Sequence, residues 1–243
     1  MAKLSVNTNK IATLRNTRAL GIPSVLHLSR VALRAGAAGI TVHPRPDQRH
    51  VRPDDVRDIA GLIRTEFPAA EFNIEGNPFI DYVHYARDVR PTQCTLVPDT
   101  PEAFTSDHGW DLDRDAGRLE PVIAQLKGFG CRVSLFMDPR PEAMKLARKL
   151  GADRVELYTE PYAAAFARHD PRAADPYIAA ARAAGEAGLG VNAGHDLNLA
   201  NLPLLVQRIP ELLEVSIGHA LIADALELGM AETVRRYIAA SAA

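Results

Sequence analysis

The densest group of potentially reactive side chains follows an apolar segment that ends near residue 43. Guanidinium groups bind phosphate or carboxylate through paired hydrogen bonds, and Pro44 and Pro46 stiffen this stretch. The pattern predicts a site for an anionic small molecule, and a solvated basic loop is the alternative. The basic residues are His43, Arg45, Arg49, His50 and Arg52.

Three of the candidates for proton transfer end an apolar segment or lie inside one. His43 ends such a segment, and an imidazole with an ordinary pKa of about 6.5 can act as acid or base at neutral pH. Glu75 and Glu156 also belong to apolar segments, where an unpaired carboxylate is costly. Catalysis explains both placements together, and ion pairs inside the protein are the alternative.

Two Gly-His pairs, Gly194-His195 and Gly218-His219, end later apolar segments, and Asp196 follows the first of them. Small residues at such positions let backbone N–H groups approach a ligand, which is typical of phosphate sites. Amide and cationic donors near the first segment could add to such a site or belong to a surface helix. They are Asn7, Asn9, Lys10, Arg15 and Arg18.

A metal site is a further interpretation of these groups. The possible ligands are His43, His50, His195, His219, Glu75, Glu156 and Asp196. No HxH or HExxH pair occurs among them, so a metal-dependent hydrolase is less favoured than metal-free acid–base chemistry on a phosphorylated substrate. Cys94 and Cys131 lack CxxC spacing and are interpreted as small buried hydrophobic residues.

The elements that must position these side chains alternate regularly between strand and helix. Strands are expected at 4–7, 39–43, 71–75, 94–97, 133–136, 155–158, 190–195 and 215–219. Helices are expected at about 24–35, 53–65, 79–89, 115–129, 141–150, 175–187, 200–209 and 220–240. Pro53 and Pro141 are expected at helix starts, and Gly36, Gly151 and Gly188 at helix ends.

Eight such units predict one α/β domain over residues 1–243, a single (β/α)8 barrel (TIM barrel) whose rim gathers the polar strand ends. A doubly wound sheet is the alternative, but no GxGxxG or P-loop follows a strand. Two insertions, 98–113 and 159–175, are expected to form rim loops, the second with an extra short helix. Long rim loops are usually lids or oligomer contacts.

Composition limits the partners. The chain has 243 residues, and its 28 Lys and Arg against 30 Asp and Glu give a net charge of −2 without a basic run. Nucleic acid is therefore an improbable partner. No apolar run reaches 18 residues, and we expect a soluble, cytoplasmic protein that does not bind membranes.

Taken together, five motifs resemble the pyridoxine 5′-phosphate synthase family over nearly the whole chain. The motifs are residues 6–16, 39–50, 73–75, 191–195 and 216–220. The resemblance implies condensation of 1-deoxy-D-xylulose 5-phosphate with 3-amino-2-oxopropyl phosphate, giving pyridoxine 5′-phosphate, phosphate and water. It implies no cofactor and no metal, and it implies a homo-octamer.

The resemblance also implies roles for individual residues. His43 and Glu75 match proton acceptors, His195 matches a proton donor, and Glu156 matches a residue that stabilises a transition state. Arg45, His50 and Thr105 match contacts to the deoxyxylulose phosphate, with Thr105 on a loop expected to close over the site. Asn7, Arg18, Gly218 and His219 match contacts to the aminoketone phosphate.

Three further substrate-binding candidates depart from the common family pattern. Many members have Asp-His at the positions of Asn9-Lys10 and Gly at the position of Asp196. Contacts through the backbone are expected to persist, and Lys10 could offer a cation to a phosphate.

Two other functions remain open. One is a different barrel isomerase or aldolase acting on a phosphorylated sugar. A Schiff-base aldolase is disfavoured because Lys127, Lys145 and Lys149 fall in expected helices and not at strand ends. The other is a non-catalytic barrel that serves as a binding or assembly module.

Overall fold

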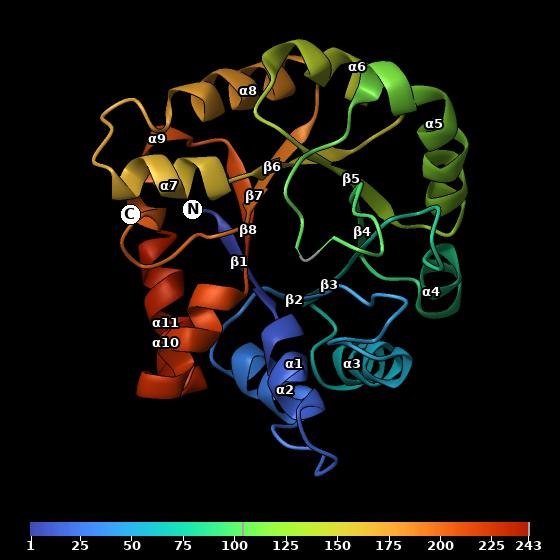
Figure 1. Cartoon of the computed structure of the whole chain (residues 1–243), viewed down its shortest axis with the longest axis vertical. Coiled ribbons are helices and arrows are strands. Elements are labelled where there is room, and N and C mark those ends of the chain that lie inside the picture. Colours follow the sequence, from blue (N-terminus) through green and yellow to red (C-terminus); the bar gives the residue numbers. More distant parts are fainter. Residues whose placement is uncertain (104, 243) are drawn as a thin grey trace.

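A computed structural model describes residues 1–103 and 105–242. Within these residues, eight parallel strands form a closed barrel in sequence order, with the last strand paired to the first (Figure 1). The strands are β1 (Lys3–Asn7), β2 (Gly39–Val42), β3 (Glu71–Gly76), β4 (Gln93–Leu96), β5 (Arg132–Met137), β6 (Arg154–Tyr158), β7 (Gly190–Gly194) and β8 (Leu212–Ile217). The predicted (β/α)8 barrel is confirmed.

Helices surround the strands and cover the outside of the barrel (Figure 1). They are α1 (Asn9–Asn16), α2 (Val25–Arg34), α3 (Pro53–Glu66), α4 (Val83–Val89), α5 (Leu112–Gly128), α6 (Met144–Lys149), α7 (Glu160–Ala167), α8 (Asp175–Glu186), α9 (Leu202–Arg208), α10 (His219–Leu228) and α11 (Met230–Ala240), with a 3₁₀ turn η1 (Pro141–Ala143) before α6. The extra helix expected in the 159–175 insertion is α7.

The structure corrects several expected boundaries. The single helix expected at 220–240 is two helices, because Gly229 takes a positive φ of 79° and ends α10. The helix expected from 79 begins only at Val83, and the helix expected at 141–150 begins as the η1 turn. Helix α1 was not among the expected elements. Asn7, just before its N-cap residue Thr8, accepts a hydrogen bond at Oδ1 from the N–H of Asn9 at 3.1 Å.

The strands that were expected to include His43, His195 and His219 stop before these residues. The backbone leaves the sheet at each position, and the histidines lie in the connection or at the start of the next helix. Strand β4 likewise ends at Leu96, one residue earlier than expected. The three imidazoles are therefore on the rim and not inside the sheet.

The inside of the barrel contains several buried polar side chains. Ser5 Oγ and Thr41 Oγ1 lie 2.7 Å apart, and Thr95 Oγ1 donates to Asn73 Oδ1 at 3.0 Å. All four residues are buried. Apolar residues alternate with them along each strand and pack against the helices, as the period of a strand requires. Polar groups at the mouth of the barrel thus continue a hydrogen-bonded interior.

The loop between β4 and α5 is anchored at its far end to β5. The N–H of Gly109 donates to Asp138 Oδ1 at 3.1 Å, and the N–H of Trp110 donates to the carbonyl of Phe136 at 3.0 Å. The indole of Trp110 also donates to the carbonyl of Leu96 at 2.8 Å. These bonds hold the base of the loop against the rim.

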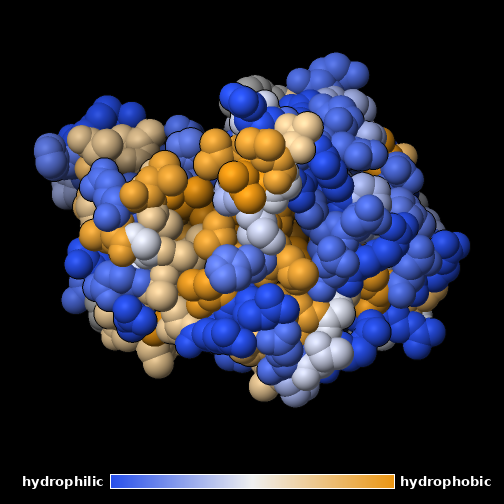
Figure 2. Space-filling model, turned by 90° about the horizontal axis from the view of Figure 1, so that it is seen from below, coloured by the Kyte–Doolittle hydropathy of each residue, from blue (hydrophilic) through white to orange (hydrophobic). Residues whose placement is uncertain are grey.

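The helices of the described ranges include none with the combined length and apolar character that crossing a bilayer requires. One side of the molecule, viewed in Figure 2, carries a concentration of apolar side chains. Exposed large apolar residues of α1, of the α1–α2 connection and of α10 are Leu14, Leu20, Ile22, Leu226 and Leu228.

Replacing Gly109 by alanine should destabilise the protein. The added Cβ would lie 2.2 Å from the backbone nitrogen of Asp138 and 2.5 Å from backbone atoms of Met137, which cannot move without disturbing β5. We expect the free energy of unfolding to fall by about 1–3 kcal/mol. Urea denaturation measures it.

Gly117→Ala is the matched control, because Gly117 lies inside α5 and a Cβ there would have no atom within 4 Å. Alanine in a helix interior is better than glycine by about 0.5–1 kcal/mol, so this variant should be slightly more stable than the wild type. A Gly109→Ala protein as stable as the wild type would show that the loop base is not tightly packed.

Candidate active site

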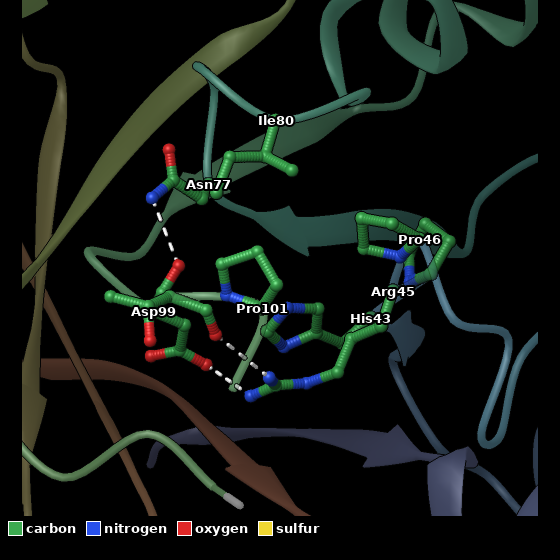
Figure 3. A pocket seen from close by; sticks show the side chains of 9 residues that line it. His43, Arg45, Pro46, Asn77, Ile80, Asp99 and Pro101 are labelled. Carbon is green, nitrogen blue, oxygen red and sulfur yellow. Dashed lines mark hydrogen bonds and ion pairs between the residues drawn. The ribbon is translucent and has the colours of Figure 1, made fainter. Parts of the chain in front are cut away.

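A small pocket opens at the rim beside the carboxyl ends of β2, β3 and β4 (Figure 3). It encloses about 270 Å³ of empty space that is partly open to solvent. In Figure 3, the guanidinium of Arg45 points toward Asp99, and the dashed lines mark its contacts. The lining residues are His43, Pro44, Arg45, Pro46, Asn77, Ile80, Asp99, Thr100 and Pro101.

His43 and Glu75 form a buried acid–base pair next to this pocket. Nδ1 of His43 lies 3.9 Å from Oε2 of Glu75. Asn7 donates to the same carboxyl oxygen at 3.3 Å, and Ser216 Oγ donates to the other one at 3.5 Å. The backbone N–H of His43 donates to Asn9 Oδ1 at 2.9 Å. Residues of β1, α1 and β8 therefore orient the pair.

The surroundings of this pair move the two pKa values in opposite directions. Burial, followed by the negative charge of Asp99, raises the pKa of Glu75 to about 8. Burial and three neighbouring basic groups, led by Arg45, hold the pKa of His43 well below its ordinary value. At neutral pH the carboxyl group is therefore protonated and the imidazole neutral. The pair contains one group able to donate a proton and one able to accept a proton.

The basic segment is not the solvated loop that was the alternative interpretation. Arg45 and His50 are both buried, at 7% and 8% exposure. Nδ1 of His50 accepts a hydrogen bond from the N–H of Val51 at 3.0 Å. Burial and then the charge of Arg45 lower the pKa of His50 to about 4, so this imidazole is also neutral at neutral pH. Among the five basic residues of the segment, only Arg52 is exposed as that alternative requires.

A second group of candidates lies around His195, just after β7. Its Nε2 is 2.9 Å from Thr105 Oγ1, and its Nδ1 is 2.8 Å from Asp196 Oδ2. His195 and Asp196 both have positive φ, at 91° and 58°. The Asp196 carboxylate orients the ring, and the β4–α5 loop reaches the ring through Thr105.

Glu156 lies below this group, inside the barrel on β6. It is 2% exposed, and its Oε2 lies 3.5 Å from Thr95 Oγ1. Burial, followed by the charges of Glu75 and Glu214, raises its pKa well above the ordinary value. A Cβ at Gly194 would lie 2.2 Å from Oε1 of Glu156. Glycine at this position thus leaves room for a neutral carboxyl group.

The remaining candidates lie farther out on the rim. Gly218 packs against Asn7, with 3.2 Å between the position of a Cβ and the Asn7 side chain. His219 is exposed at the start of α10, and Lys10 is half-buried in α1. Arg18 is exposed in the turn after α1 and is not gathered with the others. The structure instead buries Arg15, which pairs with Asp55 on α3.

Sequence reasoning missed Asp99 and Ser216 as members of the site. Each lies in or after the carboxyl end of a strand, but its partner in the site lies far away in the sequence. Cys94 and Cys131 are buried, as predicted. Across residues 1–103 and 105–242, His, Cys, Asp and Glu side chains form no group of three placed to hold a metal ion.

The family model and the sequence relatives agree on one family. The family described as "Pyridoxal phosphate biosynthesis protein PdxJ" matches residues 4–243. Pyridoxine 5′-phosphate synthase of Albidiferax ferrireducens is 58% identical over 243 residues, covering 97% of this chain and 96% of that protein. The protein of the same name from Brucella abortus is 58% identical over 245 residues, covering 99% of both.

Solved structures share the fold at low sequence identity. Thiamine phosphate pyrophosphorylase from Pyrococcus furiosus aligns with a TM-score of 0.60 and 16% identity over 98% of this chain and 95% of that chain. A tryptophan synthase from M. tuberculosis aligns with a TM-score of 0.66 and 13% identity over 99% of this chain and 92% of that chain.

The raised pKa of Glu75 predicts a specific dependence of stability on pH. Its pKa in the folded protein is about 8, against an ordinary value of 4.5. The stabilisation is therefore complete below about pH 4.5 and is lost as the pH rises through about 8. We expect the stability advantage of the wild type over Glu75→Gln to shrink between about pH 5 and 8, as measured by urea denaturation.

Glu66→Gln is the control, because a hydrogen bond from Arg30 holds the pKa of exposed Glu66 below its ordinary value. Its contribution is lost as the pH falls, so the Glu66→Gln difference should stay constant over the same window. A Glu75→Gln curve parallel to the wild type would contradict a protonated Glu75.

Proposed function

The chain belongs to the PdxJ family of pyridoxal phosphate biosynthesis proteins, a family of enzymes, and we propose that it is a pyridoxine 5′-phosphate synthase with a metal-free mechanism. The proposed reaction condenses 1-deoxy-D-xylulose 5-phosphate with 3-amino-2-oxopropyl phosphate into pyridoxine 5′-phosphate, phosphate and water. The observation that carries the proposal is the buried His43–Glu75 pair beside Arg45.

Proton transfer is the main requirement of this reaction. Imine formation, loss of phosphate, addition and loss of water, and ring closure each move protons at carbon or oxygen. The neutral imidazole of His43 is suited to accept the first proton. The protonated carboxyl of Glu75 donates before it can accept, and we assign a further donor role to His195, which follows β7.

Two phosphorylated substrates also require two anion sites. We assign the deoxyxylulose phosphate to Arg45, His50 and Thr105, with Asn9 and Lys10 on the adjoining rim. We assign the aminoketone phosphate to the N-terminus of α10 at Gly218 and His219, near Asn7 and Asp196, where backbone N–H groups favour an anion. Arg18 is exposed in the turn after α1, so its side chain would have to move toward Gly218 and His219 to contact this phosphate.

Glu156 completes the proposed set. Its buried, neutral carboxyl group can donate a hydrogen bond to an oxygen that gains charge in a transition state. A Schiff-base aldolase fits less well, because Lys127 lies in α5 while Lys145 and Lys149 lie in α6, away from the strand ends.

An assay with both substrates tests the proposal. Chelator-treated protein should form pyridoxine 5′-phosphate without added metal, as followed by absorbance and mass spectrometry. His43→Ala should lower turnover by at least about 10²-fold with the fold unchanged, because a general acid–base group is lost. His27→Ala, on the exposed side of α2, should match the wild type. A folded wild-type protein that forms no product would refute the reaction.

We also propose that copies of the chain assemble into a homo-octamer, in part through the apolar side seen in Figure 2. The exposed leucines of α10 and the α1–α2 connection support an interface there. Light scattering should give eight times the chain mass for the wild type and a smaller mass for Leu20→Glu combined with Leu226→Glu. A wild-type monomer would contradict the assembly.

A further inference from the structure

Asp99 is a buried carboxylate to which the proposed reaction assigns no role. It follows β4 at the start of the β4–α5 loop and is 4% exposed. Its Oδ2 forms an ion pair with Nη2 of Arg45 and accepts a hydrogen bond from Ser106 Oγ at 2.8 Å. Its backbone carbonyl accepts a hydrogen bond from Asn77 Nδ2 at 2.9 Å. The residue is thus fixed from three directions, and Figure 3 shows its carboxylate in direct contact with the Arg45 guanidinium.

The ion pair determines the orientation of Arg45. Besides Asp99, the guanidinium donates from Nη1 to the carbonyl of Ala103 at 2.9 Å and, more weakly, to that of Thr100 at 3.5 Å. Within the described contacts, these three bonds use three of its five N–H donors. The other two point in a direction that Asp99 helps to set, and an incoming phosphate oxygen can accept from them.

A nearby arginine strengthens the same connection between loops. Arg49 donates to the carbonyls of Ala103 at 3.0 Å and Pro101 at 2.9 Å. The segment after β2 is therefore hydrogen-bonded to the segment after β4 at several points. Thr105 of the segment after β4 also contacts His195. Asp99 is the buried acidic group among these contacts.

We propose that Asp99 is a positioning residue that holds Arg45 in the orientation in which it receives the phosphate of the deoxyxylulose substrate. This inference rests on the proposed function. A guanidinium buried without an anionic partner is costly and would turn toward solvent. Asp99 prevents that movement in the absence of substrate and so reduces the ordering needed on binding.

Asp99 also acts on the proton-transfer pair. Its charge is the second contribution, after burial, to the raised pKa of Glu75. Loss of that charge should therefore move the pH dependence governed by Glu75 to lower pH. A residue that only stabilised the loop would not produce this shift.

Asp99→Asn tests the proposal by steady-state kinetics and calorimetric titration. The KM for 1-deoxy-D-xylulose 5-phosphate should rise at least about tenfold, as loss of a charge-assisted bond predicts. The KM for the aminoketone substrate should change less than about twofold. Titration of the deoxyxylulose phosphate alone should give a matching rise in Kd, and the Glu75 limb of the pH profile should move to lower pH.

Two variants control for charge and loop effects. Asp99→Glu retains the anion and should recover part of the binding. Asp107→Asn removes an exposed carboxylate from the same loop, with 69% of its side chain accessible, and should behave as the wild type.

A double variant keeps the test valid if Asp99→Asn unfolds because Arg45 is left unpaired. In that comparison, Arg45→Gln is measured beside Arg45→Gln/Asp99→Asn. The second substitution should add no further rise in Kd.

The outcomes separate the two proposals. A wild-type protein that binds the deoxyxylulose phosphate but forms no product refutes the reaction, and the Kd series still tests Asp99. An Asp99→Asn protein with the Kd, KM and pH profile of the wild type overturns the positioning role. The role is also overturned if adding Asp99→Asn to Arg45→Gln raises the Kd by as much as Asp99→Asn raises it in the wild type.

Discussion

Burial of ionisable groups at the mouth of the barrel is the constraint on which the rest of the site depends. Charged groups are costly where water is excluded, so each must find a partner or change its protonation state. Arg45 and Asp99 take the first course and pair. Glu75 and His43 take the second, and both side chains are uncharged at neutral pH. The same burial therefore creates both an anion-binding group and a proton-transfer pair.

The polar interior of the barrel makes this arrangement possible. A barrel filled only with apolar side chains would offer Glu75 and Glu156 no polar partners. Here Asn7 and Ser216 donate to Glu75 from other strands of the barrel, and Thr95 Oγ1 lies 3.5 Å from Glu156. Glycine at 194 leaves the volume that the Glu156 carboxyl occupies. Interior packing and site chemistry therefore depend on the same residues. A side chain added at Gly194 would displace the carboxyl group of Glu156.

The sequence predicted most of the architecture because hydrophobic period and strand-end polarity are local signals. All eight strands and most helices follow from them, as does the rim position of His43, Glu75 and His195. The break at Gly229 was missed because an apolar helical pattern continues on both sides of it. Asp99 was missed for a different reason. Its partner lies 54 residues away, and only closure of the barrel brings the two loops together.

The protonation state of Glu75 is the central claim of this account, and infrared difference spectroscopy measures it most directly. The spectrum of the wild type minus that of Glu75→Gln, recorded from about pH 6 to 9, isolates the carbonyl band of this side chain. The account predicts a protonated carboxyl band at pH 7 that disappears as the pH rises through about 8. A carboxylate spectrum already complete at pH 7 would contradict it.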